Sequence, residues 1–126
     1  MIRYVDTNIL VRLMTNDIPS LAKEAISEAE KSRPGELVIL DAVLVELFFI
    51  LEENKRYGFT RDKIAIIFDG ILTIPQFKIS NKAMAAFDLF MKKKKLDFMD
   101  CLLAISSEGI KENILTFDKD LQNTLV

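Results

Sequence analysis

Residues 3–10 (RYVDTNIL) place one carboxylate and two small polar residues between two apolar runs. We interpret Asp6 as the last residue of a buried strand and Asn8 as the start of a helix. In an open α/β sheet, functional groups lie just outside the carboxyl ends of the strands. This stretch therefore predicts an α/β protein in which Asp6 stands at the functional edge of the sheet.

Strand and helix patterns alternate along the rest of the chain, which predicts a mainly parallel sheet with helices on both faces. Residues that favour helix starts support the boundaries: Pro19 at a first helical position, and Asp41, Thr60, Ser80 and Asp97 as caps. The expected strands are residues 2–5, 37–40, 77–79 and 113–117. The expected helices are residues 8–14, 19–31, 42–55, 60–71, 80–92 and 97–107, with a helical turn within residues 119–126.

The composition is that of an ordinary globular domain. The 126 residues suit one domain over residues 1–126; half of them are hydrophobic, 29% are charged, and the formal net charge is −2. No basic and apolar leader begins the chain, and the longest apolar region, residues 37–51, is too short to cross a bilayer. The single cysteine, Cys101, fits a reducing compartment. We therefore expect a cytoplasmic protein with no membrane contact.

The chain contains no histidine, which excludes several classes of enzyme. Ser-His-Asp and Cys-His nucleophiles need an imidazole, and so does histidine acid–base chemistry at neutral pH. A zinc site is disfavoured with one thiol and no imidazole. If the protein is an enzyme, carboxylates must carry the reaction, together with a hard metal ion that prefers oxygen ligands.

Glu46 is the only charged residue in the apolar helix pattern of residues 42–51. A helix this apolar is mostly buried, so we expect Glu46 to point into an interior or a cleft. An unpaired carboxylate there is unfavourable and would neutralise or find a cation. The alternative is that Glu46 lies on a narrow solvent stripe or pairs with a lysine.

Two aspartates in the second half of the chain complete the acidic set. Asp100 lies three residues after the cap Asp97, where the helix dipole also favours a carboxylate, but it shares a face with the small apolar Ala104. Asp118 ends an apolar strand pattern as Asp6 does, although most aspartates at such junctions are ordinary polar residues of a turn.

Carboxylates gathered at one edge of a sheet repel one another. Two of them about 4 Å apart repel by roughly 4 kcal/mol at an effective dielectric constant near 20, and a divalent cation reverses the sign of that energy. Magnesium takes only one or two direct carboxylates and leaves room for a phosphate oxygen. The four acids therefore indicate metal-assisted attack of water on a phosphodiester, if the fold brings them together.

Four short segments, in order along the chain, resemble the acidic motifs of PIN-domain ribonucleases, particularly the VapC-type toxins of prokaryotic toxin–antitoxin pairs. They are residues 6–10 (DTNIL), 45–47 (VEL), 97–102 (DFMDCL) and 116–118 (TFD), and the resemblance runs from residue 3 to about residue 120. It implies a three-layer α/β/α sandwich with a central, mainly parallel sheet. The chain departs from the family in two respects. Cys101 stands where the family usually has a small, alanine-like residue. Few residues follow the fourth motif, so we expect the family's last edge strand to be short or absent.

The resemblance also assigns roles to individual residues. It implies that the catalytic and metal-binding residues, around one or two Mg²⁺ or Mn²⁺ ions, are Asp6, Glu46, Asp100 and Asp118. It implies that Thr7, Asn8 and Thr116 orient those carboxylates, and that Asp97 caps its helix or joins the outer shell of the metal.

Basic residues supply candidate contacts for an RNA substrate. Lysines 92–95 immediately precede the third motif, and we expect Lys94, Lys95 and Arg12 to contact phosphates, with Lys55 and Arg56 as candidates of the same kind. The alternative is structural, because cations suit a helix C-terminus and a lysine run often forms a solvated face.

Partners are indicated by surplus apolar residues on the helices that contain Leu21 and Ile64. These residues would form a homodimer face or a groove for an antitoxin, unless they are internal. The favoured function is a metal-dependent endoribonuclease held inactive by an antitoxin. One alternative is a non-catalytic PIN-like module for RNA binding or assembly. Another is an aspartyl-phosphate enzyme or receiver domain with Asp6 as nucleophile, although residues 6–8 (DTN) lack the second aspartate of the phosphatase version.

Overall fold

The computed structural model describes residues 1–125. The chain divides into two compact units, residues 1–79 (unit 1) and the residues from Ser80 onward (unit 2). Within the described residues, no helix is both long and apolar enough to cross a membrane.

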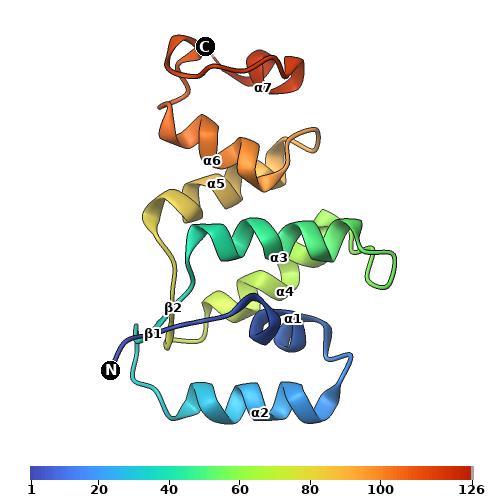
Figure 1. The fold of residues 1–126 in the computed structure, drawn as a ribbon, viewed down its shortest axis with the longest axis vertical. Coiled ribbons are helices and arrows are strands. Elements are labelled where there is room, and N and C mark those ends of the chain that lie inside the picture. The colour runs from blue at the N-terminus through green and yellow to red at the C-terminus, as the bar shows by residue number, and fades with distance from the viewer. Residues whose placement is uncertain (126) are drawn as a thin grey trace. The chain divides into compact units, whose positions relative to one another are not determined.

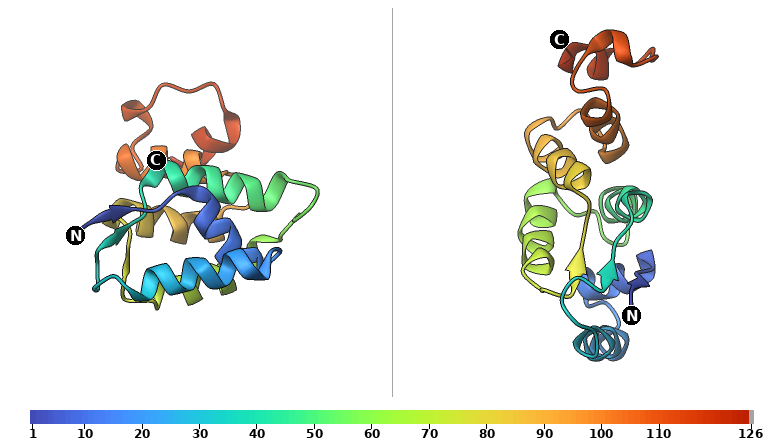
Figure 2. Two further views of the ribbon diagram at one scale, coloured as in Figure 1. Left: turned by 60° about the horizontal axis from the view of Figure 1, so that its bottom comes forward. Right: turned by 90° about the vertical axis from the view of Figure 1, so that its left-hand side faces the viewer.

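Unit 1 is built on a parallel sheet of three short strands in the order β1 (Arg3–Tyr4), β2 (Leu37–Val38) and β3 (Phe77–Lys78). Arg3 pairs with Leu37, which pairs in turn with Phe77. Figure 2 shows β2 and β3 side by side and pointing the same way. The predicted α/β class with a parallel sheet is confirmed.

Two helices connect each pair of neighbouring strands in unit 1. Helices α1 (Thr7–Thr15) and α2 (Pro19–Glu30) follow β1, and helices α3 (Asp41–Glu53) and α4 (Arg61–Leu72) follow β2. Helix α1 packs against both α2 and α3 (Figure 1). The core is apolar, with Leu10, Leu44 and Leu47 fully buried and an edge-to-face contact between Phe48 and Phe68 at 5.1 Å.

Local chemistry explains where two of the four helices of unit 1 begin. Pro19 occupies the first position of α2, and Thr60 caps α4 by accepting a hydrogen bond from the Lys63 backbone N–H at 3.2 Å. Two predictions were one residue off. Helix α1 begins at Thr7 rather than at Asn8, and Leu40, not Asp41, precedes α3 as its cap residue. Both offsets leave an aspartate at a helix start, where the dipole favours it.

Unit 2 consists of helices α5 (Asn81–Lys92), α6 (Phe98–Ser106) and α7 (Lys119–Thr124), with a 3₁₀ turn η1 (Lys111–Asn113). Ser80 caps α5 as predicted, accepting a hydrogen bond from the Ala83 backbone N–H at 3.0 Å. Helices α5 and α6 share an aromatic core in which Phe90 meets Phe98 edge-to-face at 5.9 Å. Helix α7 confirms the predicted turn, and residue 126 lies outside the described residues.

The strand predicted at residues 113–117 is wrong for the described structure. Asn113 ends η1, and residues 114–117 form no strand. The segment satisfies its backbone locally, because Gln122 Nε2 donates to the Thr116 carbonyl at 2.7 Å and the Asp118 N–H donates to Thr116 Oγ1 at 3.0 Å. Leu115 and Phe117 are consequently almost fully exposed. An alternating apolar pattern becomes a strand only where a neighbouring strand supplies hydrogen bonds.

Candidate functional site

Asp6 stands where β1 passes into α1. The Val5 N–H donates to the Val38 carbonyl at 2.9 Å and extends the pairing of β1 with β2, so the chain leaves the sheet at Asp6. Asp6 is the cap residue of α1, but its side chain accepts no capping hydrogen bond and is exposed. The carboxylate is therefore held at the carboxyl end of β1 and is available to a ligand.

Glu46 is joined to this end of unit 1 through Thr7. The Thr7 side chain is buried, at 3% exposure, and its Oγ1 donates to Glu46 Oε2 at 3.0 Å. The contact links the first turn of α1 to the middle of α3, which lie 39 residues apart in the sequence. The structure thus brings together two predicted site residues, Thr7 and Glu46, and Asp6 directly precedes Thr7 in the chain.

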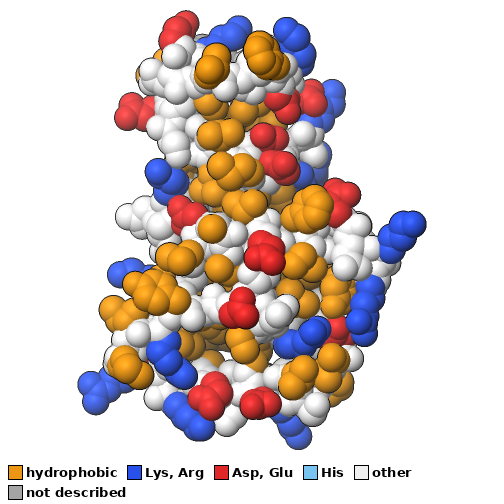
Figure 3. Space-filling model, in the orientation of Figure 1, with side chains coloured by type: hydrophobic (Ala, Val, Ile, Leu, Met, Phe, Trp, Pro, Cys, Tyr) orange, Lys and Arg blue, Asp and Glu red, His pale blue; other side chains and the backbone are white. Residues whose placement is uncertain are grey.

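Glu46 is exposed, which corrects the expectation that it points into an interior. It lies on a solvent-facing stripe of α3 with Ala42 and Phe49, while Leu44, Leu47 and Phe48 face the core. Figure 3 shows acidic side chains among hydrophobic ones on the face of unit 1 that carries α3 and the segment leading into α1. This is the solvent-stripe alternative that the apolar pattern left open.

Two adjoining clefts in unit 1 reach the predicted residues. One, of about 240 Å³, is lined by Asp6 and Ile9 together with Ala25 of α2 and Phe77 of β3. The other, of about 340 Å³, shares Ile9 and Ala25 and extends to Asn8 and Arg12. The exposed Asn8 therefore borders a cleft between α1 and α2, and its predicted role in orienting a carboxylate stays a prediction.

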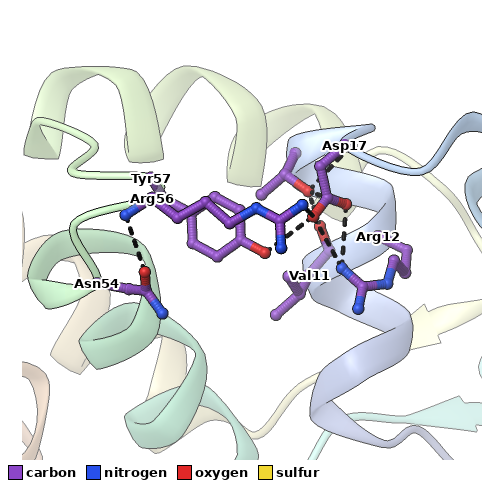
Figure 4. A network of polar contacts seen from close by, with 7 residues as sticks. Val11, Arg12, Asp17, Asn54, Arg56 and Tyr57 are labelled. Carbon is purple, nitrogen blue, oxygen red and sulfur yellow. Dashed lines mark hydrogen bonds and ion pairs between the residues drawn. The ribbon is translucent and has the colours of Figure 1, made fainter.

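Arg12 is held in a polar cluster that the sequence did not reveal (Figure 4). Its Nη1 donates to both carboxylate oxygens of Asp17 at 3.0 Å, and Tyr57 Oη donates to Asp17 Oδ2 at 2.9 Å. Thr15 Oγ1 adds a fourth contact at 2.9 Å, and Arg56 Nη2 lies 3.8 Å from Asp17 Oδ2. The cluster connects the turn between α1 and α2 to the turn between α3 and α4. The expected contact of Arg12 with an RNA phosphate stays a prediction.

The Asp17 carboxylate is held in its charged form by this cluster. Partial burial raises its pKa, but the hydrogen bonds from Thr15, Tyr57 and Arg12 together lower it, and the pKa falls to about 2. Arg12 and Thr15 are near Asp17 in the sequence, so their spacing indicated a contact with Asp17 only weakly. Tyr57, 40 residues away, offered none.

In unit 2, Asp97 and Asp100 form a reciprocal cap at the start of α6. Asp97 Oδ1 accepts from the Asp100 N–H at 2.8 Å, and Asp100 Oδ2 accepts from the Asp97 N–H at 3.3 Å. The predicted capping role of Asp97 is confirmed. The arrangement fixes the half-buried Asp100 side chain against the first turn of its own helix.

Asp100 carries a raised pKa because it is partly buried and lies near other acids. Burial makes the largest contribution, the charge of Asp97 adds to it, Asp118 adds a smaller repulsion, and the pKa rises to about 6. Asp118 caps α7 by accepting from the Leu121 N–H at 3.0 Å. Unit 2 therefore brings Asp97, Asp100 and Asp118 into electrostatic contact.

The predicted acids fall into two sets, Asp6 and Glu46 in unit 1 and Asp100 and Asp118 in unit 2. Neither unit by itself, in the part of the chain that the structure describes, gathers three or more acidic or thiol side chains close enough to hold a metal ion. All donors in both sets are carboxylate oxygens, which suit Mg²⁺ or Mn²⁺ and not zinc. The donor chemistry therefore fits a hard divalent ion, and the roles of these four residues stay predictions.

The structure is that of an α/β protein with one aspartate at the carboxyl end of β1 and others at the N-terminal ends of α6 and α7. The family model for the PIN domain matches residues 3–124, nearly the whole chain and both units. The chain belongs to the PIN domain family, generally a nuclease fold whose members usually use divalent metals. Its parallel sheet and helices fit the α/β sandwich of that family. Comparisons with curated proteins and with solved structures found no match.

Proposed function

We propose that this protein is a metal-dependent endoribonuclease and the toxin of a toxin–antitoxin pair. The observation that carries the proposal is the half-buried carboxylate of Asp100 beside Asp97, whose pKa is raised to about 6 first by burial and then by repulsion from Asp97 and, more weakly, Asp118. A divalent cation offsets this repulsion, because it interacts favourably with every carboxylate in the group. Membership of a nuclease family with a chain-long match supports the same reaction class.

Three of the four predicted ligands, Glu46, Asp100 and Asp118, accept a hydrogen bond that orients them. Thr7 holds Glu46 by a hydrogen bond, and the backbone N–H of Asp97 holds Asp100. Together with Asp6 and Asp118, these residues would bind Mg²⁺ or Mn²⁺. When bound, such an ion polarises a phosphodiester and activates water for its hydrolysis. Ligands held in advance lose little conformational freedom when the ion and the RNA bind.

Cleavage of a mixed RNA panel by wild type and Asp6→Asn tests the proposal, with Mg²⁺, Mn²⁺ or EDTA. Any copurified antitoxin must first be removed, since a bound inhibitor would imitate inactivity. Asp69→Asn is the matched control, because it removes one charge from an exposed position on α4. We expect metal-dependent cleavage by wild type and by the control, and none by Asp6→Asn.

A titration of Mn²⁺ binding separates the remaining alternatives. Wild type that binds Mn²⁺ and RNA but cuts no RNA would support a non-catalytic RNA-binding module instead. Wild type that binds no divalent metal would overturn the four-carboxylate site. A trapped phosphate on Asp6 would favour the aspartyl-phosphate alternative.

The partner side of the proposal rests on the cleft between α1 and α2. Its lining combines the partly exposed Ile9 and Leu21 with the acidic Glu24 and Glu28, which suits an amphipathic segment with basic residues. We propose that an antitoxin binds here and that the toxin forms a homodimer. Coexpression with a small protein encoded beside this gene should restore growth, and Leu21→Glu should abolish the rescue. Light scattering of the purified protein measures the oligomeric state.

A further inference from the structure

Four consecutive lysines, residues 92–95, connect α5 to α6 within unit 2 and are all exposed. We call this segment the lysine loop. It holds four of the 17 Lys and Arg residues of a chain whose formal net charge is −2. It is therefore the densest concentration of positive charge in the sequence, and it lies directly before the reciprocal cap of Asp97 and Asp100.

The backbone of the lysine loop is anchored at both ends. The Lys93 N–H donates to the Leu89 carbonyl at 2.8 Å, and the Leu96 N–H donates to the Lys93 carbonyl at 3.0 Å. Leu96 is 1% exposed and packs into the core of unit 2. The loop is thus a short turn that presents its side chains outward.

The helix dipole accounts for only half of these charges. Lys92 lies in the last turn of α5 and Lys93 is its cap residue, where cations are favoured. Lys94 and Lys95 lie beyond α5, and Leu96 and the cap residue Asp97 separate them from the first residue of α6. Among residues 1–125, no carboxylate forms an ion pair within 4 Å of Lys95. The dipole of α5 therefore accounts for neither Lys94 nor Lys95.

Residues 92–100 (KKKKLDFMD) carry a formal net charge of +2. Asp97 and Asp100 together carry at most two negative charges, against four positive charges on the lysines. A lysine ammonium is a point charge that binds phosphate oxygens without reading a base. A fixed row of such charges beside acidic residues suits a polyanion that must be held close to a metal centre.

We propose that the lysine loop binds the phosphates of single-stranded RNA that flank the bond cut at the acidic site. This inference rests on the proposed ribonuclease function and names how that site holds its substrate. The loop contributes affinity that is independent of base sequence and falls with rising salt concentration. Target choice must then come from other contacts.

The test compares Lys94→Gln/Lys95→Gln with the control Lys82→Gln/Lys111→Gln, which removes the same charge from exposed positions of unit 2. Lys82 and Lys92 are ten residues apart on α5, about 15 Å along the helix axis. Binding of fluorescein-labelled 20-nucleotide oligo(U) and oligo(A) is measured by anisotropy in EDTA, from 50 to 200 mM NaCl. Circular dichroism confirms that both variants are folded.

We expect the loop variant to lower the slope of log affinity against log salt by about 1.4, since each lost phosphate contact contributes about 0.7 on a single strand. At 0.1 M salt the same loss corresponds to roughly 10- to 30-fold weaker binding of both oligonucleotides, with the control within about twofold of wild type. In cleavage assays, KM should rise while kcat is unchanged.

The outcomes for the loop and for the nuclease are separable. If the loop variant and the control bind RNA equally, or if wild type does not bind RNA in EDTA, the loop proposal is overturned even when cleavage occurs. If binding depends on the loop but wild type cuts no RNA with any metal, the loop proposal stands and the nuclease proposal fails. A loss confined to one oligonucleotide would contradict a backbone contact.

Discussion

Thr7→Val removes the hydrogen bond that holds Glu46 and keeps the buried shape of the side chain. Thr7 is 3% exposed, and its Oγ1 lies 3.0 Å from Glu46 Oε2. A hydrogen bond to a charged group stabilises a fold by about 1.5–3 kcal/mol, but the exposed Glu46 recovers water when the bond is lost. We therefore expect a loss of about 1 kcal/mol, or a fall in Tm of about 3–5 °C for a chain of this length.

Thr7→Ser is the matched variant, because it keeps the hydroxyl and deletes a buried methyl group. Loss of a methyl from a packed site costs about 1 kcal/mol through reduced burial and the small cavity left behind. The two variants should thus unfold at similar temperatures in differential scanning fluorimetry. They differ in whether Glu46 still has its donor.

Metal affinity distinguishes positioning of Glu46 from simple packing of Thr7. Removing a group that orients a metal ligand typically weakens affinity 10- to 100-fold. We expect Thr7→Val to weaken Mn²⁺ binding about tenfold in isothermal titration calorimetry, and Thr7→Ser to stay within about twofold of wild type. Equal effects of the two variants, or wild-type affinity in Thr7→Val, would refute the argument that Thr7 positions a metal ligand.

Three further predictions follow from the helix starts and the Asp17 cluster. Because the Asp17 pKa is about 2, below the unfolded value of about 3.8, its contribution to stability is complete above about pH 4 and is lost as the pH falls towards 2. Tyr57→Phe removes a hydrogen-bond donor to Asp17, so the midpoint of acid unfolding, followed by circular dichroism, should move to higher pH. Because the Asp100 pKa is raised to about 6, its charge opposes folding increasingly from about pH 4 to 6. In urea unfolding, Asp100→Asn should therefore raise stability at pH 7.5 by about 1 kcal/mol, after allowance for solvent screening of a partly exposed group, and by much less at pH 3.5. The control Asp88→Asn, at an exposed position, should not show this gain. Asp97→Ala should cost about 1 kcal/mol of stability by losing the cap of α6, whereas Asp97→Asn, measured in the same urea titration, should lose a few tenths at most.

The features that the sequence predicted well depend on neighbouring residues. Pro19 at the first position of α2, and the caps Thr60, Ser80 and Asp97, each act on a backbone group within three residues of themselves. Such signals are complete within one turn of helix, so spacing alone identifies them. Each of the three confirmed strands has a hydrophobic pattern that ends where a helix begins. This pattern predicts where a strand lies in the sequence but not which strands pair with it.

The features that the sequence did not predict depend on contacts between distant segments. Residues 114–117 have the composition of a strand, but pairing needs a second strand. Instead, the Thr116 carbonyl accepts a hydrogen bond from Gln122 Nε2, and the Asp118 N–H donates to Thr116 Oγ1. Glu46 looked internal because α3 is apolar on more than its core face, and only the packing showed that Phe49 and Glu46 share an exposed stripe. The contact between Asp17 and Tyr57 joins turns 40 residues apart.

Three of the four predicted metal ligands stand at helix starts: Asp6 before α1, Asp100 in the first turn of α6, and Asp118 before α7. Helix dipoles favour negative charge at each of these positions, so the fold offsets part of the repulsion that collecting carboxylates creates. The same placement gives each aspartate a structural reason to be there. Alanine at Asp100 or Asp118 would therefore confound a lost capping hydrogen bond with a lost ligand, whereas the Asp6 side chain makes no capping hydrogen bond. Asparagine caps a helix as well as aspartate and lacks the charge, so loss of metal binding in Asp6→Asn, Asp100→Asn and Asp118→Asn, with folding intact, is the result that assigns these residues to a metal site.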